Sequence, residues 1–232
     1  MSTYLRILRV EPDVRTKLMQ LTADFYRFHA DSFDESRTGA WHSWEAVLAE
    51  IEPFTDILDL GCGNGRFAAF LDEHAAGFRY SCIDAERSFI AAARARYPAH
   101  TFDVGQLTDI DDTYDAIVSF GVFHHVPGFA QRAELLQQLA KALRNNGRLA
   151  LSLWQPRLLD NFDKKAAPQK IDGLEPDDHL LGWKGDFEHV RYCHHFDDDE
   201  IHRLIESSPL RLVRQFQGTT NDKTNRYVIL EK

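Results

Sequence analysis

The sequence lacks a long hydrophobic run, and no stretch approaches the roughly 18 apolar residues that cross a bilayer. Its opening residues, Met1 to Arg6, lack the apolar core of a secretion signal. Cysteine is scarce, and none of Cys62, Cys82 and Cys193 belongs to the Cys-x-x-Cys pair typical of zinc sites. We therefore expect free thiols, no metal, no membrane contact and a cytoplasmic protein.

Basic residues are outnumbered, since 27 lysines and arginines face 36 acidic residues, which gives a net charge of −9. Such a chain repels RNA at long range unless its basic side chains gather on one face. The overall composition, with 44% hydrophobic and 27% charged residues, is that of a globular protein with a hydrophobic core. Non-specific binding of nucleic acid is therefore disfavoured.

Hydrophobic spacing predicts helices at about 14–29 and 41–51. Beyond Pro53, strands and helices alternate, which predicts a mainly parallel sheet covered on both faces. A long polar segment at 155–197 is expected to be loop. The expected later strands are 57–60, 78–83, 100–103, 114–120, 148–154, 210–217 and 226–231, and the expected later helices are 66–73, 88–97, 130–144 and 199–207.

A glycine-rich loop, Asp59-Leu60-Gly61-Cys62-Gly63-Asn64-Gly65, lies where a buried strand is expected to turn into a helix. Its spacing differs from the G-x-G-x-x-G of dinucleotide loops, and Asp59 precedes the first glycine by two residues. A carboxylate there suits a cationic ligand such as S-adenosylmethionine, which has no phosphate. We expect the amino end of the helix to face the ligand's carboxylate and Asp59, on the lip of the loop, to face its ammonium.

Two further acids end the next expected strands. Asp84 can accept hydrogen bonds from a ribose diol, and the alternative is a solvated turn residue. Asp103 and Val104 end the third expected strand, where the adenine amino group would fall.

Residues 57–154 resemble the class I S-adenosylmethionine-dependent methyltransferases. The resemblance implies an α/β, Rossmann-like fold with a seven-stranded, mainly parallel sheet and helices on both faces. It also implies S-adenosyl-L-methionine as cofactor and S-adenosyl-L-homocysteine as product. The implied cofactor-binding residues, with their neighbours, are Asp59, Gly61, Cys62, Gly63, Asp84, Ala85, Asp103, Val104, Phe120 and Gly121.

Four short motifs resemble a narrower family, the tRNA methyltransferases that esterify carboxymethyl-uridine at the anticodon wobble position. One departure is Arg226, where that family has tryptophan. The resemblance implies tRNA as substrate and a small activator protein as partner. The motifs are Phe33-x3-Arg37-x3-Trp41, Phe123-His124-His125, Arg191-Tyr192-Cys193-His194-His195-Phe196 and Asn225-Arg226-Tyr227.

Two pairs of residues are the candidates for cofactor contact and proton transfer. Arg37 and Trp41 share one face if a helix has begun there. Arg37 can then bind the cofactor's carboxylate or an acidic acceptor, or pair with the nearby acids at 31–35. His124 and His125 are candidate general bases, because histidine titrates near neutrality; the alternatives are pocket lining and packing.

The remaining candidates concern the methyl acceptor. Tyr26 and Phe33 can form a lid over the cofactor; the alternative is that they pack a helix. A basic run of Arg157, Lys164, Lys165 and Lys170 can contact phosphates or be a solvated loop. The expected substrate-binding residues are Tyr26, Trp154, Arg191, Tyr192 and His194.

We thus expect residues 1–52 to form an N-terminal helical cap that contributes to the active site. Residues 53–232 should form the methyltransferase domain, with a substrate-facing insertion at about 155–197. The leading functional hypothesis is methylation of the carboxymethyl group of a modified wobble uridine in tRNA. The alternatives are a small-metabolite O- or N-methyltransferase and a non-catalytic cofactor-binding subunit.

Overall fold

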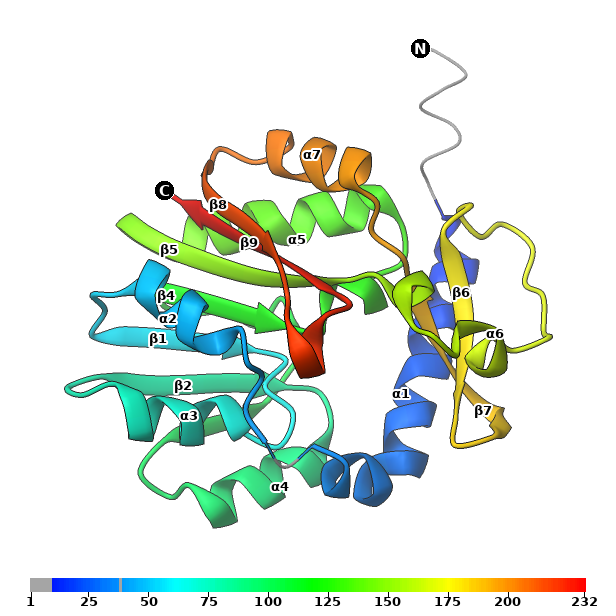
Figure 1. The fold of residues 1–232 in the computed structure, drawn as a ribbon, viewed down its shortest axis with the longest axis horizontal. Coiled ribbons are helices and arrows are strands. Elements are labelled where there is room, and N and C mark those ends of the chain that lie inside the picture. The colour runs from blue at the N-terminus through cyan, green and yellow to red at the C-terminus, as the bar shows by residue number, and fades with distance from the viewer. Residues whose placement is uncertain (1–9, 38) are drawn as a thin grey trace.

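The computed structural model describes residues 10–37 and 39–232, so the opening residues considered above lie outside it (Figure 1). A seven-stranded sheet forms the centre, in the order β3-β2-β1-β4-β5-β9-β8. All neighbours pair in parallel except β9, which runs antiparallel to β5 and β8. This confirms the expected sheet. Its strands are β1 Asp56–Leu60, β2 Arg79–Asp84, β3 Thr101–Val104, β4 Tyr114–Phe120, β5 Leu143–Trp154, β8 Arg211–Gln217 and β9 Asn225–Glu231.

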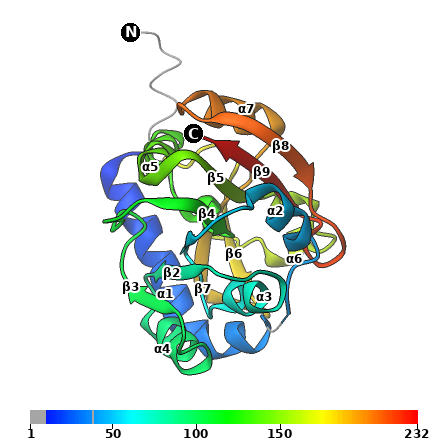
Figure 2. The ribbon, with the colours of Figure 1, turned by 90° about the vertical axis from the view of Figure 1, so that its left-hand side faces the viewer.

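Helices cover both faces of the sheet because the buried strands are apolar on both sides. Ile57 and Val118 pack with the helices α2, α3 and α4, whereas Leu58 and Ile117 pack with α5 and α7. Figure 2 shows the two helical layers. The helices are α2 Trp44–Ile51, α3 Arg66–His74, α4 Arg87–Arg96, α5 Phe129–Ala142 and α7 Asp198–Glu206.

Helix α1, Pro12–Glu35, is longer than the predicted 14–29 and begins with proline at its first turn. It lies beside the carboxyl ends of the parallel strands (Figure 1). Its apolar side packs on a second, two-stranded sheet through Leu18, Leu180 and Tyr192. The amino-terminal segment therefore stands over the edge of the main sheet where the glycine loop lies.

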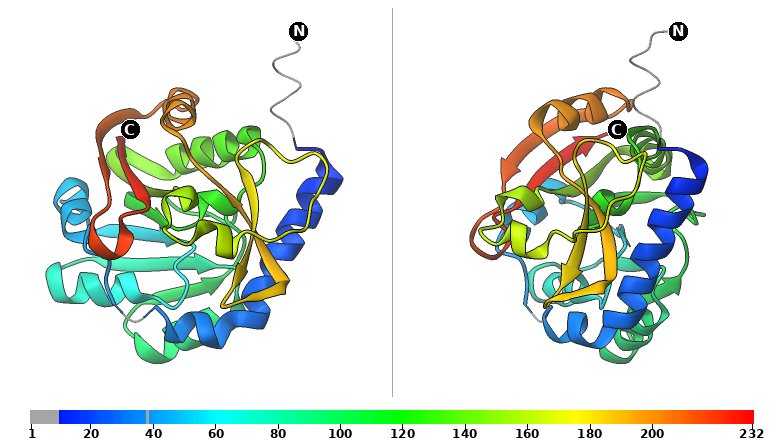
Figure 3. Two further views of the ribbon diagram at one scale, coloured as in Figure 1. Left: turned by 45° about the vertical axis from the view of Figure 1, so that its right-hand side comes forward. Right: turned by 90° about the vertical axis from the view of Figure 1, so that its right-hand side faces the viewer.

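The expectation of loop at 155–197 was wrong. This segment holds the short helix α6, Phe162–Lys165, and a hairpin of β6, Asp178–Trp183, and β7, Asp186–His194. Figure 3 shows the hairpin against α1. Several buried positions of β7 are polar, including Arg191 and His194. Hydrophobic spacing does not predict a strand of this kind, because polar side chains occupy positions on its buried face.

The predicted helix at 130–144 ends earlier, at Ala142, because Leu143 already pairs with Tyr114 as the first residue of β5. In the described part of the chain, no helix is long and apolar enough to cross a membrane.

Candidate active site

The glycine loop joins β1 to α3 and is held in a tight, left-handed path. Gly61, Gly63 and Gly65 have φ angles of 77°, 55° and 79°, which side chains other than glycine rarely adopt. The amide of Gly61 donates to the carbonyl of Ile83 (2.7 Å). A Cβ on Gly61 would lie 2.3 Å from the side chain of Val122, so this glycine lets the loop pack against the segment after β4.

Gly63 is different, because no described heavy atom lies within 4 Å of the position that a Cβ would take. Its amide donates to Oδ2 of Asp84 (2.8 Å). The loop is thus tied down on one side and open on the other. An open glycine backbone at the amino end of a helix fits a ligand that approaches the main chain closely.

Asp84 lies at the end of β2, where its second oxygen, Oδ1, accepts from the amide of Glu86 (2.8 Å). Burial raises the pKa of this carboxyl. In the register Asp84 stands beside Val104, an exposed apolar side chain. Asp103 faces Arg94 at 3.5 Å and is exposed, and Ala85 is exposed after Asp84. Asp84 and Val104 therefore offer a polar and an apolar contact side by side at this edge.

Asp59 does not form the expected exposed lip. Only 2% of this residue is exposed, and Oδ2 accepts from the hydroxyl of Tyr80 (2.7 Å). Burial raises the pKa of the carboxyl to about 7. Asp59 supports the strand beneath the loop, since a carboxyl two residues before the first glycine still belongs to β1.

The expectation of free thiols was wrong for two cysteines. Cys62 of the glycine loop and Cys82 of β2 form a disulfide, with Cα atoms 6.0 Å apart. Parallel pairing of β1 and β2 brings them together, because Cys82 pairs with Asp59. Cys193 is a buried thiol.

β4 ends at Phe120, and Gly121 follows it in different surroundings. The Phe120 ring packs edge-on to Phe67 and Tyr227, so it belongs to the core. Gly121 has a φ of 74°, and its amide donates to Oγ of Ser152 (2.8 Å). A Cβ on Gly121 would lie 3.7 Å from the ring of Trp41. Trp41 therefore lies beside both residues, since its ring centre is 6.3 Å from that of Phe120.

Arg37 and Trp41 do not share a helical face, because α1 ends at Glu35 and α2 begins at Trp44. The Arg37 guanidinium lies over the Phe33 ring, 4.6 Å from its centre. Among the described residues it forms no ion pair, because Asp34 is paired with Arg96 instead. The surface salt bridge considered for Arg37 is therefore absent from this part of the chain.

His125 uses both ring nitrogens within the protein. Nδ1 lies 2.6 Å from the carbonyl of Tyr192, which can only accept, so Nδ1 carries the proton. Nε2 then accepts from the hydroxyl of Tyr26 (2.8 Å). Burial, with the charge of Arg191, lowers the pKa of His125 to about 3. His125 therefore positions Tyr26 and has no nitrogen left for proton transfer.

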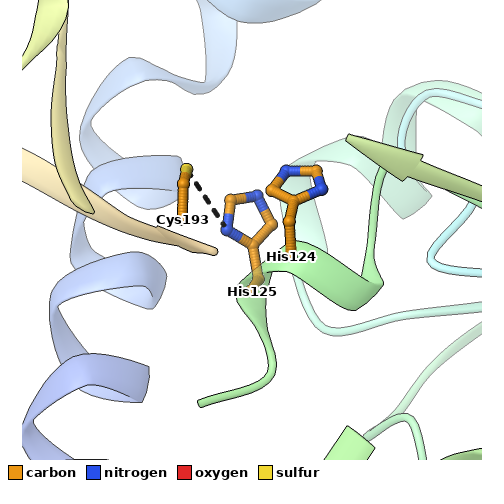
Figure 4. Close-up of side chains that lie close together, drawn as sticks. All are labelled: His124, His125 and Cys193. Atoms are coloured by element: carbon orange, nitrogen blue, oxygen red, sulfur yellow. Dashed lines mark hydrogen bonds between the residues drawn. The ribbon is translucent and has the colours of Figure 1, made fainter. Parts of the chain in front are cut away.

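His124 lies against His125, with ring centres 4.0 Å apart, as Figure 4 shows with Cys193 beside them. Its Nδ1 is buried and has no partner in the described ranges 10–37 and 39–232. Burial lowers the pKa of His124 far below its usual value. This imidazole is neutral at physiological pH and keeps one polar atom for a ligand.

Arg191 is the most unusual group of the site. It is 4% exposed, and Nε and Nη1 are buried without a hydrogen bond to any described residue. Its guanidinium lies between four aromatic rings, which we name the Arg191 cage. The distances from Cζ to the ring centres are 4.5 Å for Phe25, 5.8 Å for Phe33, 5.8 Å for Trp154 and 5.7 Å for Trp183.

A buried cation without an anionic partner is costly unless a ligand supplies the anion. Trp154 connects the Arg191 cage to the histidines, since its ring centre lies 4.9 Å from that of His124. The charges of Arg191 and Arg37 also lower the pKa of Lys165, after the larger effect of burial. The charges of Arg37 and Arg191 thus act on both His124 and Lys165.

Tyr192 and His194 do not line this site. The Tyr192 hydroxyl donates to Oδ1 of Asp178 (2.6 Å). His194 is 2% exposed, and its nitrogens bind Asp178 (2.7 Å) and Glu200 (2.6 Å). Both belong to a buried polar network that holds β7 against α7. Alternation along β7 explains the difference, because Arg191 and Tyr192 point to opposite faces.

One site residue was missed by sequence reasoning. Arg66 begins α3, stacks over Trp41 at 4.8 Å and donates to the carbonyl of Gly39 (2.9 Å). Burial lowers its pKa to about 10. Its place directly after the glycine loop was the available signal, because the first turn of that helix borders any ligand of the loop.

Comparison with known proteins agrees with this geometry. Residues 58–149 match a family described as "Methyltransferase domain". A curated relative, "Probable tRNA methyltransferase 9B" of Bos taurus, is 28% identical over 69% of this chain and 32% of its own length. Another is "tRNA (carboxymethyluridine(34)-5-O)-methyltransferase ALKBH8" of Mus musculus, 26% identical over 56% of this chain and 19% of its own length. The chain spans about a third or less of the length of these relatives.

Among solved structures, the 1,6-didemethyltoxoflavin-N1-methyltransferase of Burkholderia thailandensis, crystallised with S-adenosylhomocysteine, has a TM-score of 0.68. It is 18% identical, and the match covers 97% of this chain and 91% of that one. This likeness establishes the fold. Residues 58–149 of the chain are therefore similar to a methyltransferase domain, and the chain has the fold of the S-adenosylmethionine-dependent methyltransferases.

Proposed function

We propose that this chain transfers a methyl group from S-adenosylmethionine to a carboxylate, and that the carboxylate is the carboxymethyl group of a modified wobble uridine in tRNA. The observation that carries the proposal is the buried guanidinium of Arg191, which has no anionic partner in the described part of the chain. Relatives named as tRNA methyltransferases support the choice of acceptor.

The chain's own residues fit the cofactor. Gly63 leaves the main chain open, and Asp84 and Val104 lie side by side where a ribose and an adenine would bind. When bound, S-adenosylmethionine supplies an electrophilic methyl group on a cationic sulfur. Arg37, Trp41 and Arg66 border the loop and would hold the amino-acid part of the cofactor.

A carboxylate acceptor agrees with the neutral histidines. It is ionised at neutral pH and needs no general base, and His125, with a pKa of about 3, is too weak a base to take up a proton near pH 7. A carboxylate oxygen bonds to the methyl carbon, and the electron pair of the broken carbon–sulfur bond stays on sulfur. Both charges are neutralised, so a site that excludes water favours the reaction. The task of the protein is alignment, which Arg191 and His124 Nδ1 would provide.

The four residues of the basic run, considered above for phosphate contact, are not equally placed to contact an acceptor. Arg157 forms an ion pair with Asp177, and Lys164 and Lys170 are exposed. Lys165 is half-buried near Arg191 and is the member best placed beside an acceptor. The proposal includes a cytoplasmic location, a small activator protein and residues 1–52 as a cap over the site.

A small carboxylic acid is the second candidate acceptor, because the net charge of −9 disfavours RNA at long range. The test is to incubate the chain and methyl-labelled cofactor with total RNA and with small metabolites, then separate the pools. We expect alkali-labile label in tRNA, since methyl esters hydrolyse in base. Label in small molecules alone would contradict the tRNA assignment, and alkali-stable label would contradict the carboxylate.

A further inference from the structure

Three side chains meet where α1 crosses the β6–β7 hairpin, next to the Arg191 cage, since the ring centre of His29 lies 4.8 Å from that of Phe25. His29 comes from α1, and Asp186 and His189 come from the start of β7. Oδ2 of Asp186 lies 3.2 Å from Nε2 of His29 and 3.0 Å from Nδ1 of His189. One atom from each of the three lies within 4.8 Å of the others.

His29 contributes a buried nitrogen that lacks a partner. The residue is 9% exposed, and its Nε2 makes no hydrogen bond within the described residues although it lies 3.2 Å from Oδ2 of Asp186. An orphaned imidazole nitrogen beside a carboxylate is a state that a metal ion would satisfy.

The other two side chains are already oriented. Oδ1 of Asp186 accepts from the amide of Glu188 (2.7 Å), so its other oxygen faces the two imidazoles. Phe28 stacks on the His189 ring, with centres 3.6 Å apart and planes 9° apart. Such outer contacts fix ligand orientation in metal sites.

The separations also fit metal coordination. With metal–ligand bonds of about 2.0–2.1 Å, adjacent ligand atoms of an octahedral or tetrahedral ion lie about 2.8–3.4 Å apart. The two measured separations, 3.2 and 3.0 Å, fall in this range. Two imidazoles with one carboxylate form a donor set typical of zinc and related divalent ions.

We propose that His29, Asp186 and His189 bind a divalent transition-metal ion of the Zn²⁺ class, with water in the remaining positions. Two other clusters are less suited. His194 already uses both nitrogens on Asp178 and Glu200, and His125, beside Cys193, uses both of its own.

The bound ion would join α1 to the hairpin. Tyr26 lies one helical turn before His29, and Arg191 lies two residues after His189. An ion at this crossing would therefore brace the two elements that carry the acceptor-side residues. The proposal does not depend on the identity of the acceptor.

The test is competition of the purified, metal-stripped full chain with a chromophoric chelator for Zn²⁺. We expect one site per chain. The variants His29→Gln, Asp186→Asn and His189→Gln should weaken binding on the order of 100-fold or more. His202→Gln changes an exposed histidine that is paired with Glu206; it is the matched control and should bind as the wild type does.

A cobalt spectrum keeps the test independent of variant folding. Co²⁺ bound to the wild-type chain should show visible bands without an intense thiolate band, because the three proposed ligands include no cysteine. A thiolate band would place the ion at Cys193, and unchanged zinc affinity in the three variants would place it elsewhere. Either result, or the absence of stoichiometric binding in the wild type, would overturn the proposal.

Discussion

The hydroxyl of Tyr26 lies 2.8 Å from Nε2 of His125, and this hydrogen bond joins the first helix to the turn after β4. Burial raises the pKa of Tyr26 to about 12, so its hydroxyl stays protonated and donates. The same imidazole donates to the carbonyl of Tyr192 on β7. One neutral histidine thereby connects the main sheet, α1 and the hairpin.

We expect the free energy of unfolding to fall less in mild acid for His125→Asn than for the wild type. The folded chain keeps His125 neutral down to about pH 3, whereas the unfolded chain takes up a proton near its ordinary pKa of about 6.5. Between these values the unfolded state binds more protons, so the free energy of unfolding falls as the pH falls.

From about pH 7.5 to about pH 5.5 this histidine accounts for a loss of about 1.4 kcal/mol. Urea unfolding at both pH values measures it, and His202→Asn, at an exposed position, should keep the wild-type loss. An equal loss in His125→Asn would show that the imidazole is not held neutral.

Replacement of Arg191 separates acceptor binding from stability. Arg191→Met should lower methyl transfer by between about 10-fold and 100-fold, because a charged hydrogen bond to the acceptor disappears. Its free energy of unfolding should not fall, since an unpaired buried charge is removed. Binding of S-adenosylhomocysteine should persist by calorimetry.

Arg191→Lys keeps the charge but loses the planar fork, so its activity should lie between those of the wild type and Arg191→Met. A large loss of stability in Arg191→Met would mean that the guanidinium is a structural group.

Gly63→Ala tests the open side of the glycine loop. The left-handed φ of 55° should cost about 1–2 kcal/mol of stability. The added methyl group also enters the open cradle, so the affinity for S-adenosylhomocysteine should fall about 10-fold or more.

Gly77→Ala is the matched control. Its φ is 73°, it also has no described atom within 4 Å of the added Cβ, and it lies at the opposite edge of the sheet. It should lose similar stability and retain cofactor affinity. Equal affinity in both variants would remove Gly63 from the cofactor site.

The buried network beneath the hairpin should dominate stability. Arg132 is 1% exposed and binds Glu175 (2.6 Å) and Glu200 (2.8 Å). Arg132→Met leaves these carboxylates without their cation, and we expect a loss of about 3–5 kcal/mol in chemical denaturation. Arg211→Met, which breaks an exposed pair with Glu231, should stay close to the wild type. Similar effects of both variants would contradict a structural role for the network.

The sequence was sufficient for the main sheet and the glycine loop. Alternating apolar segments predicted the sheet strands to within a few residues, except at the start of β5, because a parallel sheet buries both faces and needs continuous hydrophobic runs. Gly61, Gly63 and Gly65 predicted the left-handed turn, since other residues rarely adopt that conformation. These features depend on local sequence.

Tertiary structure alone decided the acceptor side. The β6–β7 hairpin was unrecognised because its buried residues include arginine, tyrosine and histidine, whose burial depends on partners far away in the sequence. Neighbours in one motif also separated, with Arg191 in an aromatic cage and His194 in an ion-pair network. A sequence specifies which groups are present, but the pKa and partner of each buried polar group are set by the elements that pack around it.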